Sequence, residues 1–335
     1  MADLALSFNL PSALFWNQSA SVFSIYHHFF HAHRDPIRKL FSIPNGRIQL
    51  PGLPLLSSDE LPSLCEPANP NSLVFQLFDA HFRVLNRDPH LKILINSFEE
   101  LERDALRAIP NVDLVTVGPV IQREIPSDAS TKAHVAWLNS KPKSSVVYVS
   151  FGSIAALSKP QLEEIAGALL DSGRPFLWVM RKTVNGVEDE AVSCRAELEA
   201  RGKIVSWCSQ VEILSNPATG CFVTHCGWNS SLESIACGVP VVAFPQWTDQ
   251  GTNAKIIEEL SESGVRLRAN GDDIVERGEI KRCLELVMDP RAEGEILRRN
   301  VGKWKELAKK ATGEGGSSHV NIGAFVDEVS NAAAL

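Results

Sequence analysis

The sequence lacks an excess of basic residues. Its 335 residues include 33 lysines and arginines against 40 aspartates and glutamates, which gives a formal net charge of -7 at pH 7. Proteins that bind nucleic acid neutralise its phosphates with a basic patch or stripe, and the sequence has none. We therefore expect no nucleic-acid partner. An anionic ligand would have to be held locally, for example by backbone amides at the start of a helix.

Long apolar runs and regularly spaced cysteines are also missing. No apolar stretch is long enough to cross a bilayer, and the N-terminus MADLALSFNLPSALFW has an acidic residue where a signal peptide has basic ones. The seven cysteines are odd in number and lack the spacing of a disulfide framework. We expect reduced thiols, a cytoplasmic protein and no membrane partner. The sequence is silent on oligomeric state.

From Ser144 onward, short apolar strands alternate with helical segments. Strands are predicted at SVVYVSF, PFLWVM, GKIVSW, GCFVTH and VPVVAF, and a helix at KPQLEEIAGALLDSG. Buried strands that alternate with helices predict a doubly wound parallel sheet. The chain also exceeds the length at which a single hydrophobic core usually stops growing. We therefore predict an α/β protein with two lobes.

The first part of the chain shows the same alternation in a looser form. A strand is expected at PSALFW, a helix from Ala20 to Phe30, a second strand and helix at LKILINSFEELERDAL, and a last strand at DLVTVGPV. The polar stretch that begins at Ile121 predicts a linker. A proline-rich loop from Leu50 to Pro70 interrupts this lobe, and loops of that length are usually lids or ligand walls.

The stretch FVTHCGWNSSLESIACGVP, from Phe222 to Pro240, predicts a strand that turns sharply into a helix. Doubly wound sheets bind ligands at the carboxyl ends of their strands, where His225 is expected, so the corner suits an anion. A purely structural alternative exists. Ser230 and Glu233 fit the S-x-x-E capping box, in which the serine caps the helix and the glutamate reaches back to its amide.

Three other kinds of site fit the sequence poorly. A zinc site would need spacing such as C-x-x-C, which is absent. In addition, His225 and Cys226 are neighbours in an extended chain, so their side chains should face opposite sides. The segment GWNSS lacks the second glycine of a hydrolase elbow, and no dinucleotide or P-loop fingerprint follows a strand. We expect no metal and no cofactor. The zinc ligands considered are Cys208, Cys221, His225, Cys226 and Cys237.

The stretch WCSQVEILSNPATGCFVTHCGWNSSLESIACGVPVVAFPQWTDQ, from Trp207 to Gln250, resembles the signature box of plant family 1 UDP-glycosyltransferases in length and at every diagnostic position. The segments VVYVSFGS, PFLWVMR, EGGSS and NIGAFVDEV agree, so the resemblance covers essentially the whole chain. LPSALFWNQSASVFSIYHHFF and LPGLPLLSSDELPS are most similar to flavonoid, anthocyanin 5-O and crocetin glucosyltransferases. The resemblance implies a GT-B fold with two Rossmann-like, doubly wound lobes.

The resemblance also implies a division of the chain. Residues 1–120 would form an N-terminal lobe that binds the acceptor, 121–136 a linker and 137–315 a C-terminal lobe that binds the UDP-sugar. A C-terminal helix at 316–335 would pack back on the N-terminal lobe. Family members place their catalytic histidine just after the first strand and its aspartate partner on a later strand. Neither has a counterpart here, so we expect an incomplete N-terminal lobe and name no catalytic residue.

On the donor side, the resemblance assigns residues to the nucleotide. Trp207 would stack on the uracil through its flat indole face, and Gln210 would lie near the base and ribose. Glu233 would accept hydrogen bonds from both ribose hydroxyls, which favours the ligand role over the capping box. Cys208 belongs to the same UDP-sugar-binding set. The residues implied around the diphosphate are Ser153, His225, Asn229 and Ser230.

The sugar end of the donor would be set by Trp228, Asp249 and Gln250. In the family, glutamine at the last position of the box goes with glucose and histidine with galactose. Gln250 therefore favours UDP-glucose as the donor substrate. The reaction implied is transfer of glucose, with inversion, to a hydroxyl of a small lipophilic plant metabolite such as a flavonoid.

The acceptor side is less well defined. Trp16, Gln18 and Tyr26 could line the acceptor pocket, or could be ordinary core residues. A replacement base is not expected, because a base must lie within hydrogen-bond reach of the acceptor. The histidines considered for that role are His27, His28, His31 and His33. Two functions stay open: a UDP-dependent glucosyltransferase, and a non-catalytic remnant that binds UDP-sugar. We expect the chain as given to bind UDP without useful transfer.

Overall fold

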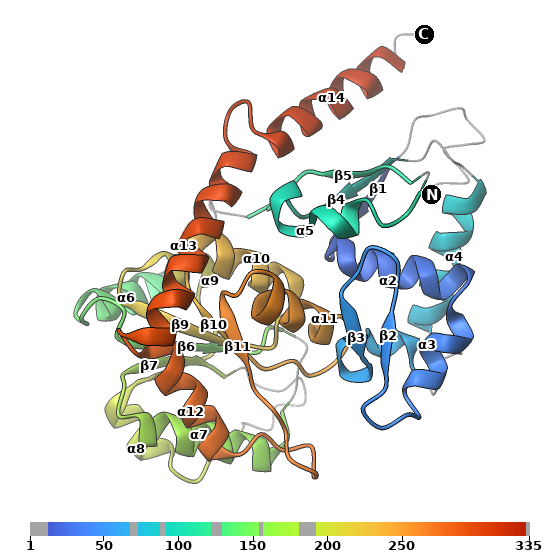
Figure 1. The fold of residues 1–335 in the computed structure, drawn as a ribbon. Coiled ribbons are helices and arrows are strands. Elements are labelled where there is room, and N and C mark those ends of the chain that lie inside the picture. The colour runs from blue at the N-terminus through green and yellow to red at the C-terminus, as the bar shows by residue number, and fades with distance from the viewer. Residues whose placement is uncertain are drawn as a thin grey trace. The chain divides into compact units, whose positions relative to one another are not determined.

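The computed structural model describes residues 13–67, 73–87, 92–110, 112–121, 129–153, 157–180 and 192–332. They form two compact units, whose elements are labelled in Figure 1. Unit 1 comprises Met1–Val120, Trp247–Asn253 and Glu306–Leu335, and unit 2 comprises Ile121–Gln246 and Ala254–Lys305. None of the helices in the described ranges has the length and apolar character that crossing a membrane requires.

Unit 2 is built on a six-stranded parallel sheet with the order β11-β10-β9-β6-β7-β8. The first of these strands along the chain lies in the middle, the next two lie on one side and the last three on the other, as in a doubly wound fold. The order therefore reverses between β6 and β9. The strands are β6 (Val146–Ser150), β7 (Phe176–Val179), β8 (Lys203–Val205), β9 (Thr219–Thr224), β10 (Val241–Ala243) and β11 (Gly264–Arg266).

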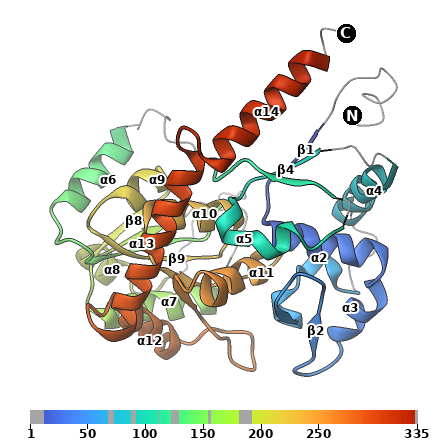
Figure 2. The same ribbon diagram turned by 45° about the horizontal axis from the view of Figure 1, so that its top comes forward.

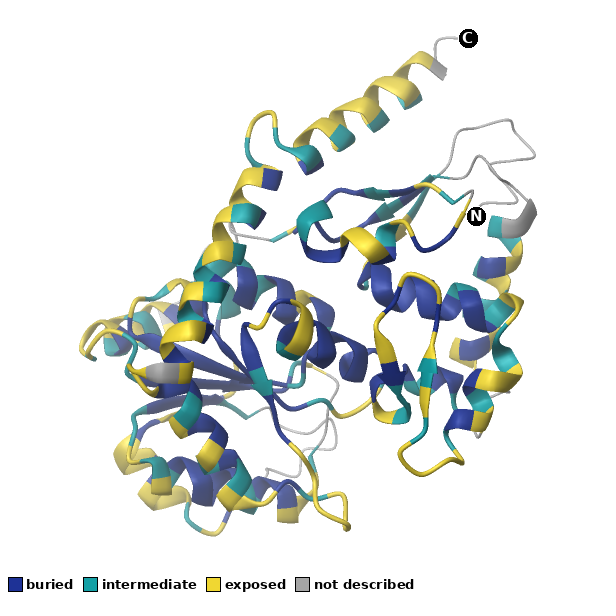
Figure 3. Cartoon of the chain, viewed as in Figure 1, coloured by how far each residue is buried: buried dark blue, intermediate teal, exposed yellow. Residues whose placement is uncertain are grey.

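Helices cover both faces of this sheet, as Figures 1 and 2 show. On β6, Val147 and Val149 pack toward one group of helices, and Val146 and Tyr148 toward the other. Because both faces are covered, the strands are rich in apolar residues. Every residue of β6, β9 and β10 is buried, and Figure 3 draws the middle of the sheet in the colour of buried residues. The first group is α7 (Lys159–Ser172), α8 (Arg195–Arg201) and α12 (Arg277–Met288), and the second includes α6 (Ala129–Asn139) and α9 (Gln210–Ser215).

Helix α7 shows how local sequence sets the ends of a helix. The hydroxyl of Ser158, its N-cap residue, accepts a hydrogen bond of 3.4 Å from the amide of Gln161. Pro160 lies in the first turn, where the amide that proline lacks would have no helical partner. The helix ends at Gly173, whose φ of 62° lies in the left-handed region that glycine tolerates.

Unit 1 contains a three-stranded parallel sheet with the order β1-β4-β5, together with a hairpin of β2 and β3. Its strands are β1 (Ala13–Trp16), β2 (Arg47–Gln49), β3 (Leu55–Ser57), β4 (Lys92–Ile95) and β5 (Leu114–Thr116). Its helices include α2 (Ala20–His31), α3 (Arg34–Leu40), α4 (Leu73–Arg87), α5 (Glu99–Leu106) and α14 (Ser317–Ala332). On α14, the hydroxyl of Ser318 donates to the carbonyl of Gly118 at 2.6 Å, so this helix packs within unit 1.

A buried carboxylate holds the start of α2. The amides of Ala20 and Ser21 donate to Glu102 at 3.0 and 2.9 Å, and the hydroxyls of Ser21 and Ser97 donate at 2.8 and 2.6 Å. Burial raises the pKa of Glu102, and these hydrogen bonds oppose the shift. A negative charge at this helix end is also favoured by the helix dipole.

Three segments differ from what the sequence predicts. Residues 122–128 of the expected linker lie outside the described residues. From Ala129 the chain is helical, because Trp137 and Leu138 of α6 pack against the hydrophobic cluster between the sheet of unit 2 and α9. The described part of the proline-rich loop, residues 50–67, contains β3 and two short 3-10 helices, η1 (Ser58–Glu60) and η2 (Ser63–Cys65). Its leucines lie in the unit 1 core, except Leu55, which is exposed. Unit 2 ends at Lys305, within α13 (Ala292–Thr312).

Candidate donor site

The polar corner of the sequence lies at the point where the strand order of unit 2 reverses. Ser150 and Thr224 are paired at the ends of β6 and β9, so the residues that follow these strands come together. The imidazole of His225 lies directly against Gly152: a β-carbon on Gly152 would be 2.7 Å from Cε1 and 2.8 Å from Nε2. Gly152 has a φ of 72°, so both its space and its backbone favour glycine.

The turn after β9 also brings backbone against the histidine. A β-carbon on Gly227 would be 2.6 Å from His225 Nε2. Cys226, between the two, has a φ of 63°, in the left-handed region that non-glycine residues rarely adopt. On the other ring nitrogen, Nδ1 lies 3.3 Å from the hydroxyl oxygen of Thr224. The imidazole is therefore fixed between two backbone segments at the carboxyl edge of the sheet.

Helix α10 (Trp228–Cys237) starts directly after this turn, and its N-cap is Gly227. The amide of Ser231 donates to the Gly227 carbonyl at 3.0 Å. Ser230 is therefore the third residue of the helix, inside its first turn, and no side chain caps the helix. The capping-box interpretation of Ser230 and Glu233 is wrong, because the strained turn at Cys226 lets the helix begin three residues earlier than that motif requires.

Gln210, the first residue of α9, links the two α10 side chains that a capping box would have occupied. Its Nε2 donates to Ser230 Oγ at 2.9 Å and to Glu233 Oε2 at 2.6 Å. The buried hydroxyl of Tyr148, on β6, donates to Gln210 Oε1 at 3.4 Å. Burial raises the pKa of Glu233 above its ordinary value, and the hydrogen bond from Gln210 opposes the shift.

Two residues just before α9 differ in orientation. Trp207 is 41% exposed, so its indole is accessible to a flat ligand. Cys208 is buried, and its sulfur lies 3.6 Å from the Tyr148 hydroxyl. The side chain of Cys208 therefore faces the core, and only its main chain is available to a ligand.

The remaining residues predicted around the diphosphate and sugar fall into two groups. Ser153 and Asn229 are exposed, Ser230 and Trp228 are buried, and His225 is half-buried; all of these belong to unit 2. Asp249 and Gln250 are buried and belong to unit 1. Gln250 begins α11 (Gln250–Lys255), and its Oε1 accepts from the amide of Trp247 at 3.1 Å.

Of the three residues predicted for the acceptor, two are core residues of unit 1. Trp16 is 5% exposed and makes edge contacts with Phe23 and Phe78, at centroid distances of 5.2 and 5.7 Å. Tyr26 is also buried, and burial raises its pKa. Packing accounts for both positions, so an acceptor role for them and for the half-buried Gln18 stays a prediction.

The four neighbouring histidines pack on one another. His27 stacks on His31 with ring centroids 4.0 Å apart, and His28 and His33 meet edge to face at 5.3 Å. Burial, and then the neighbouring His31 and His28, lower the pKa of His27 to about 4. Nothing in these contacts assigns a proton-transfer role to any of the four.

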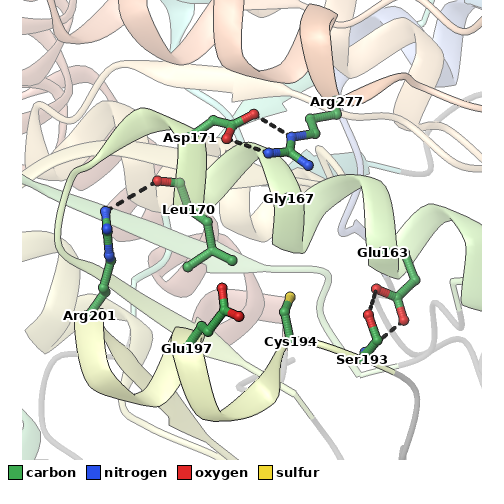
Figure 4. A pocket seen from close by; sticks show the side chains of 9 residues that line it. All are labelled: Glu163, Gly167, Leu170, Asp171, Ser193, Cys194, Glu197, Arg201 and Arg277. Atoms are coloured by element: carbon green, nitrogen blue, oxygen red, sulfur yellow. Dashed lines mark hydrogen bonds and ion pairs between the residues drawn. The ribbon is translucent and has the colours of Figure 1, made fainter.

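Unit 2 also contains a pocket of about 410 Å³ between α7, α8 and the start of α12, lined by none of the residues predicted for the donor (Figure 4). Four of its five charged side chains, those of Glu163, Asp171, Arg201 and Arg277, have hydrogen-bond partners. Arg277 forms a two-pronged ion pair with Asp171, and the amide and hydroxyl of Ser193 donate to Glu163 at 2.7 and 2.9 Å.

Within the described ranges, no cluster of three or more histidine, cysteine, aspartate or glutamate side chains could hold a metal ion.

Comparison with known proteins decides the family. Residues 107–297 match the sequence profile described as UDP-glucoronosyl and UDP-glucosyl transferase. The chain is 48% identical over 98% of its length to crocetin glucosyltransferase, chloroplastic, of Gardenia jasminoides, covering 73% of that protein. It is 46% identical to the Verbena hybrida anthocyanidin 3-O-glucoside 5-O-glucosyltransferase, over 98% of the chain and 74% of the relative.

The chain belongs to the UDP-glycosyltransferase family. A solved structure of Phytolacca americana UGT2, complexed with UDP-2fluoro-glucose and pterostilbene, superposes with a TM-score of 0.86 at 29% identity, over 98% of this chain and 74% of that one. This likeness confirms the α/β GT-B fold class predicted from the sequence. The UDP-glycosyltransferase resemblance, including its crocetin and anthocyanin 5-O subgroup, is confirmed as well.

Sequence reasoning did not single out Tyr148, Gly152 or Asn253. Tyr148 is flanked by valines in the sequence. A hydroxyl group within such an apolar run was the available indication of a buried polar role. The glycine in FGS was read only as part of a motif. Asn253 gave no indication of its own, since Ser19, which donates to its side chain, is 234 residues distant in the sequence.

Proposed function

We propose that this chain is a UDP-dependent glucosyltransferase that transfers glucose from UDP-glucose, with inversion, to a hydroxyl of a small lipophilic metabolite such as a flavonoid. The observation that carries the proposal is the arrangement of Gln210, Ser230 and Glu233 beside the reversal point of a doubly wound sheet. Ligands of such sheets bind outside the carboxyl ends of the strands at that point.

The nucleotide would be bound by side chains of unit 2. The exposed indole of Trp207 offers a flat face for the uracil. Glu233, already oriented by Gln210, would accept hydrogen bonds from the ribose hydroxyls. Cys208 would contribute through its main chain.

The diphosphate would lie at the N-terminus of α10. The amides of a first helical turn point along the axis, and the helix dipole favours an anion there. Because the chain carries a net charge of -7, the diphosphate would be attracted by the amides at this helix start and not by an overall positive charge. The side chains proposed to assist are Ser153, His225, Asn229 and Ser230.

Asp249 and Gln250 are proposed to bind the hydroxyls of the sugar, with Trp228 nearby, and Gln250 supports glucose as the sugar. For the acceptor, the Gardenia and Verbena relatives are named for crocetin and an anthocyanidin glucoside, and the Phytolacca enzyme binds pterostilbene. These names support a small acceptor with an apolar, conjugated body. We place the protein in the cytoplasm, which its seven free cysteines support, although the Gardenia relative is named chloroplastic.

Two measurements test the proposal separately. Calorimetric titration with UDP tests the nucleotide site, and mass spectrometry of reactions containing UDP-glucose and a flavonol panel tests transfer. The sequence alone led us to expect UDP binding without useful transfer, but the relatives are named glucosyltransferases. We therefore expect UDP binding and a glucoside whose anomeric configuration is inverted. UDP binding without any glucoside would restrict the function to donor binding, and failure to bind UDP would contradict the proposal.

A further inference from the structure

The segment Trp247–Asn253, which carries the proposed sugar-binding residues, is held by the proline-rich loop of unit 1. The amide of Thr248 donates to Ser63 Oγ, and the amide of Ser63 donates to the Thr248 carbonyl, both at 3.0 Å. The hydroxyl of Thr252 donates to the Glu60 carbonyl at 2.6 Å. A β-carbon on Gly251 would lie 2.2 Å from the Asp59 carbonyl oxygen. These contacts explain why the segment belongs to unit 1.

A chain of hydrogen bonds then runs from helix α2 to Asp249. The hydroxyl of Ser19 donates to Asn253 Oδ1 at 3.2 Å, and Asn253 Nδ2 donates to Asp249 Oδ2 at 2.8 Å. Thr248 Oγ1 donates to the other carboxylate oxygen of Asp249 at 3.0 Å. Ser19 and Asn253 are completely buried and Asp249 is 7% exposed.

The direction of this chain is set at the N-cap of α2. Ser19 Oγ accepts the amide hydrogen of Val22 at 3.2 Å, so the hydroxyl proton remains for Asn253. Because Asn253 Oδ1 accepts that proton, its amide nitrogen faces Asp249. Ser19 thus accepts from Val22 and donates to Asn253, and Asn253 accepts from Ser19 and donates to Asp249. Each oxygen of the Asp249 carboxylate accepts a hydrogen bond.

We propose that Asn253, oriented by Ser19, is a positioning residue for Asp249 and thereby sets donor-sugar selectivity. The inference rests on the proposed function, in which Asp249 binds the sugar. Glucose and galactose differ only in the direction of one hydroxyl, so discrimination requires a carboxylate whose position is fixed within a fraction of an ångström. The buried chain from Ser19 supplies that constraint. Through this chain of hydrogen bonds, the proline-rich loop and α2 contribute to recognition of the donor sugar.

The same contacts could serve stability alone, and the test must separate the two roles. The variants are Asn253→Leu, which fills the space without hydrogen bonds, Ser19→Ala, which loses both the cap and the donor, and Ser19→Thr, which keeps both. Ser158→Ala is the matched control, because it removes the N-cap hydroxyl of α7 without touching this chain. Calorimetry gives dissociation constants for UDP, UDP-glucose and UDP-galactose, and thermal melts monitor folding.

We expect wild type to prefer UDP-glucose to UDP-galactose. The preference should fall about tenfold in Asn253→Leu and about threefold in Ser19→Ala, while UDP affinity changes by less than about twofold. Ser19→Thr should restore the preference. Ser158→Ala should lower the melting temperature and leave the preference unchanged. Should Asn253→Leu fail to fold, the three serine variants still decide between the two roles.

Three outcomes would overturn the inference, and they differ in what they leave standing. An unchanged sugar preference in folded Asn253→Leu and Ser19→Ala would make the chain of hydrogen bonds purely structural, with the proposed function intact. A wild-type protein that binds UDP but both sugars equally would remove the sugar role of Asp249. A wild-type protein that does not bind UDP would remove the proposed function itself, and the inference with it.

Discussion

The imidazole of His225 lies so close to Gly152 that a β-carbon at residue 152 would be 2.7 Å from its Cε1 atom. The two residues follow β9 and β6, the strands between which the sheet order reverses. The backbone of one strand end thus fixes the side chain of the other. We propose that the diphosphate binds at this place, so a change at Gly152 should act on the ligand through His225.

Gly152→Ala should weaken UDP binding about tenfold or more and weaken uridine binding much less, because the new methyl group displaces His225 from the diphosphate. Gly173→Ala is the matched control. Its φ of 62° imposes a similar strain, of about 1 to 2 kcal/mol, but a β-carbon there has no atom within 4 Å. Calorimetry with UDP and with uridine measures both effects. Equal losses of affinity for UDP and for uridine would show that the diphosphate does not bind at this corner.

Gln250→His should shift donor preference from UDP-glucose toward UDP-galactose. The side chain of Gln250 is buried and its Oε1 accepts from the amide of Trp247, so its amide nitrogen is oriented by the turn that begins α11. A histidine presents its hydrogen-bonding atoms differently to a sugar hydroxyl. Competition between the two donors, measured by displacement of one by the other, reports the shift. A ratio equal to that of wild type would show that Gln250 does not read the sugar.

Acid should destabilise unit 1 through His27. Its pKa is lowered from 6.5 to about 4 in the folded state, so the unfolded chain binds more protons between these values. The stabilisation is fully present above pH 6.5 and is lost as the pH falls toward 4. His27→Phe, which keeps the stack on His31, should therefore lose less stability than wild type between pH 7 and pH 5. Urea denaturation at both pH values measures this, and identical losses would contradict the assignment.

Five of the six strands of unit 2 could be predicted because they are short runs rich in apolar residues. The sixth, β11, was not predicted, because its three residues include Gly264 and Arg266 and form no apolar run. The position proposed for the anion follows from the same pattern, since doubly wound sheets bind ligands at the carboxyl ends of their strands. The start of α10 could not be predicted, because a cysteine at φ 63° has no sequence pattern of its own. Ser230 and Glu233 fit a capping motif that the turn at Cys226 makes impossible.

Long-range contacts were the other part that the sequence could not reveal. Ser19 and Asn253 are 234 residues apart, and nothing local to either residue predicts their hydrogen bond. The same holds for Trp247–Asn253, which joins unit 1 through Ser63 and Glu60 although the chain on both sides of it belongs to unit 2. A local pattern can also suggest a contact that packing explains: Trp16 and Tyr26, considered for a ligand wall, are packed in the core.

The central claim is that Glu233, oriented by Gln210, binds the ribose of UDP, and titration of wild type and Glu233→Ala with UDP tests it most directly. Loss of a carboxylate that accepts two hydroxyl hydrogen bonds should cost about 2 to 3 kcal/mol of binding free energy, with a small change in melting temperature. Glu163→Ala, which loses the hydrogen bonds from Ser193 in the polar pocket of unit 2, should bind UDP as wild type does. A Glu233→Ala protein with wild-type affinity and a large drop in melting temperature would contradict the account.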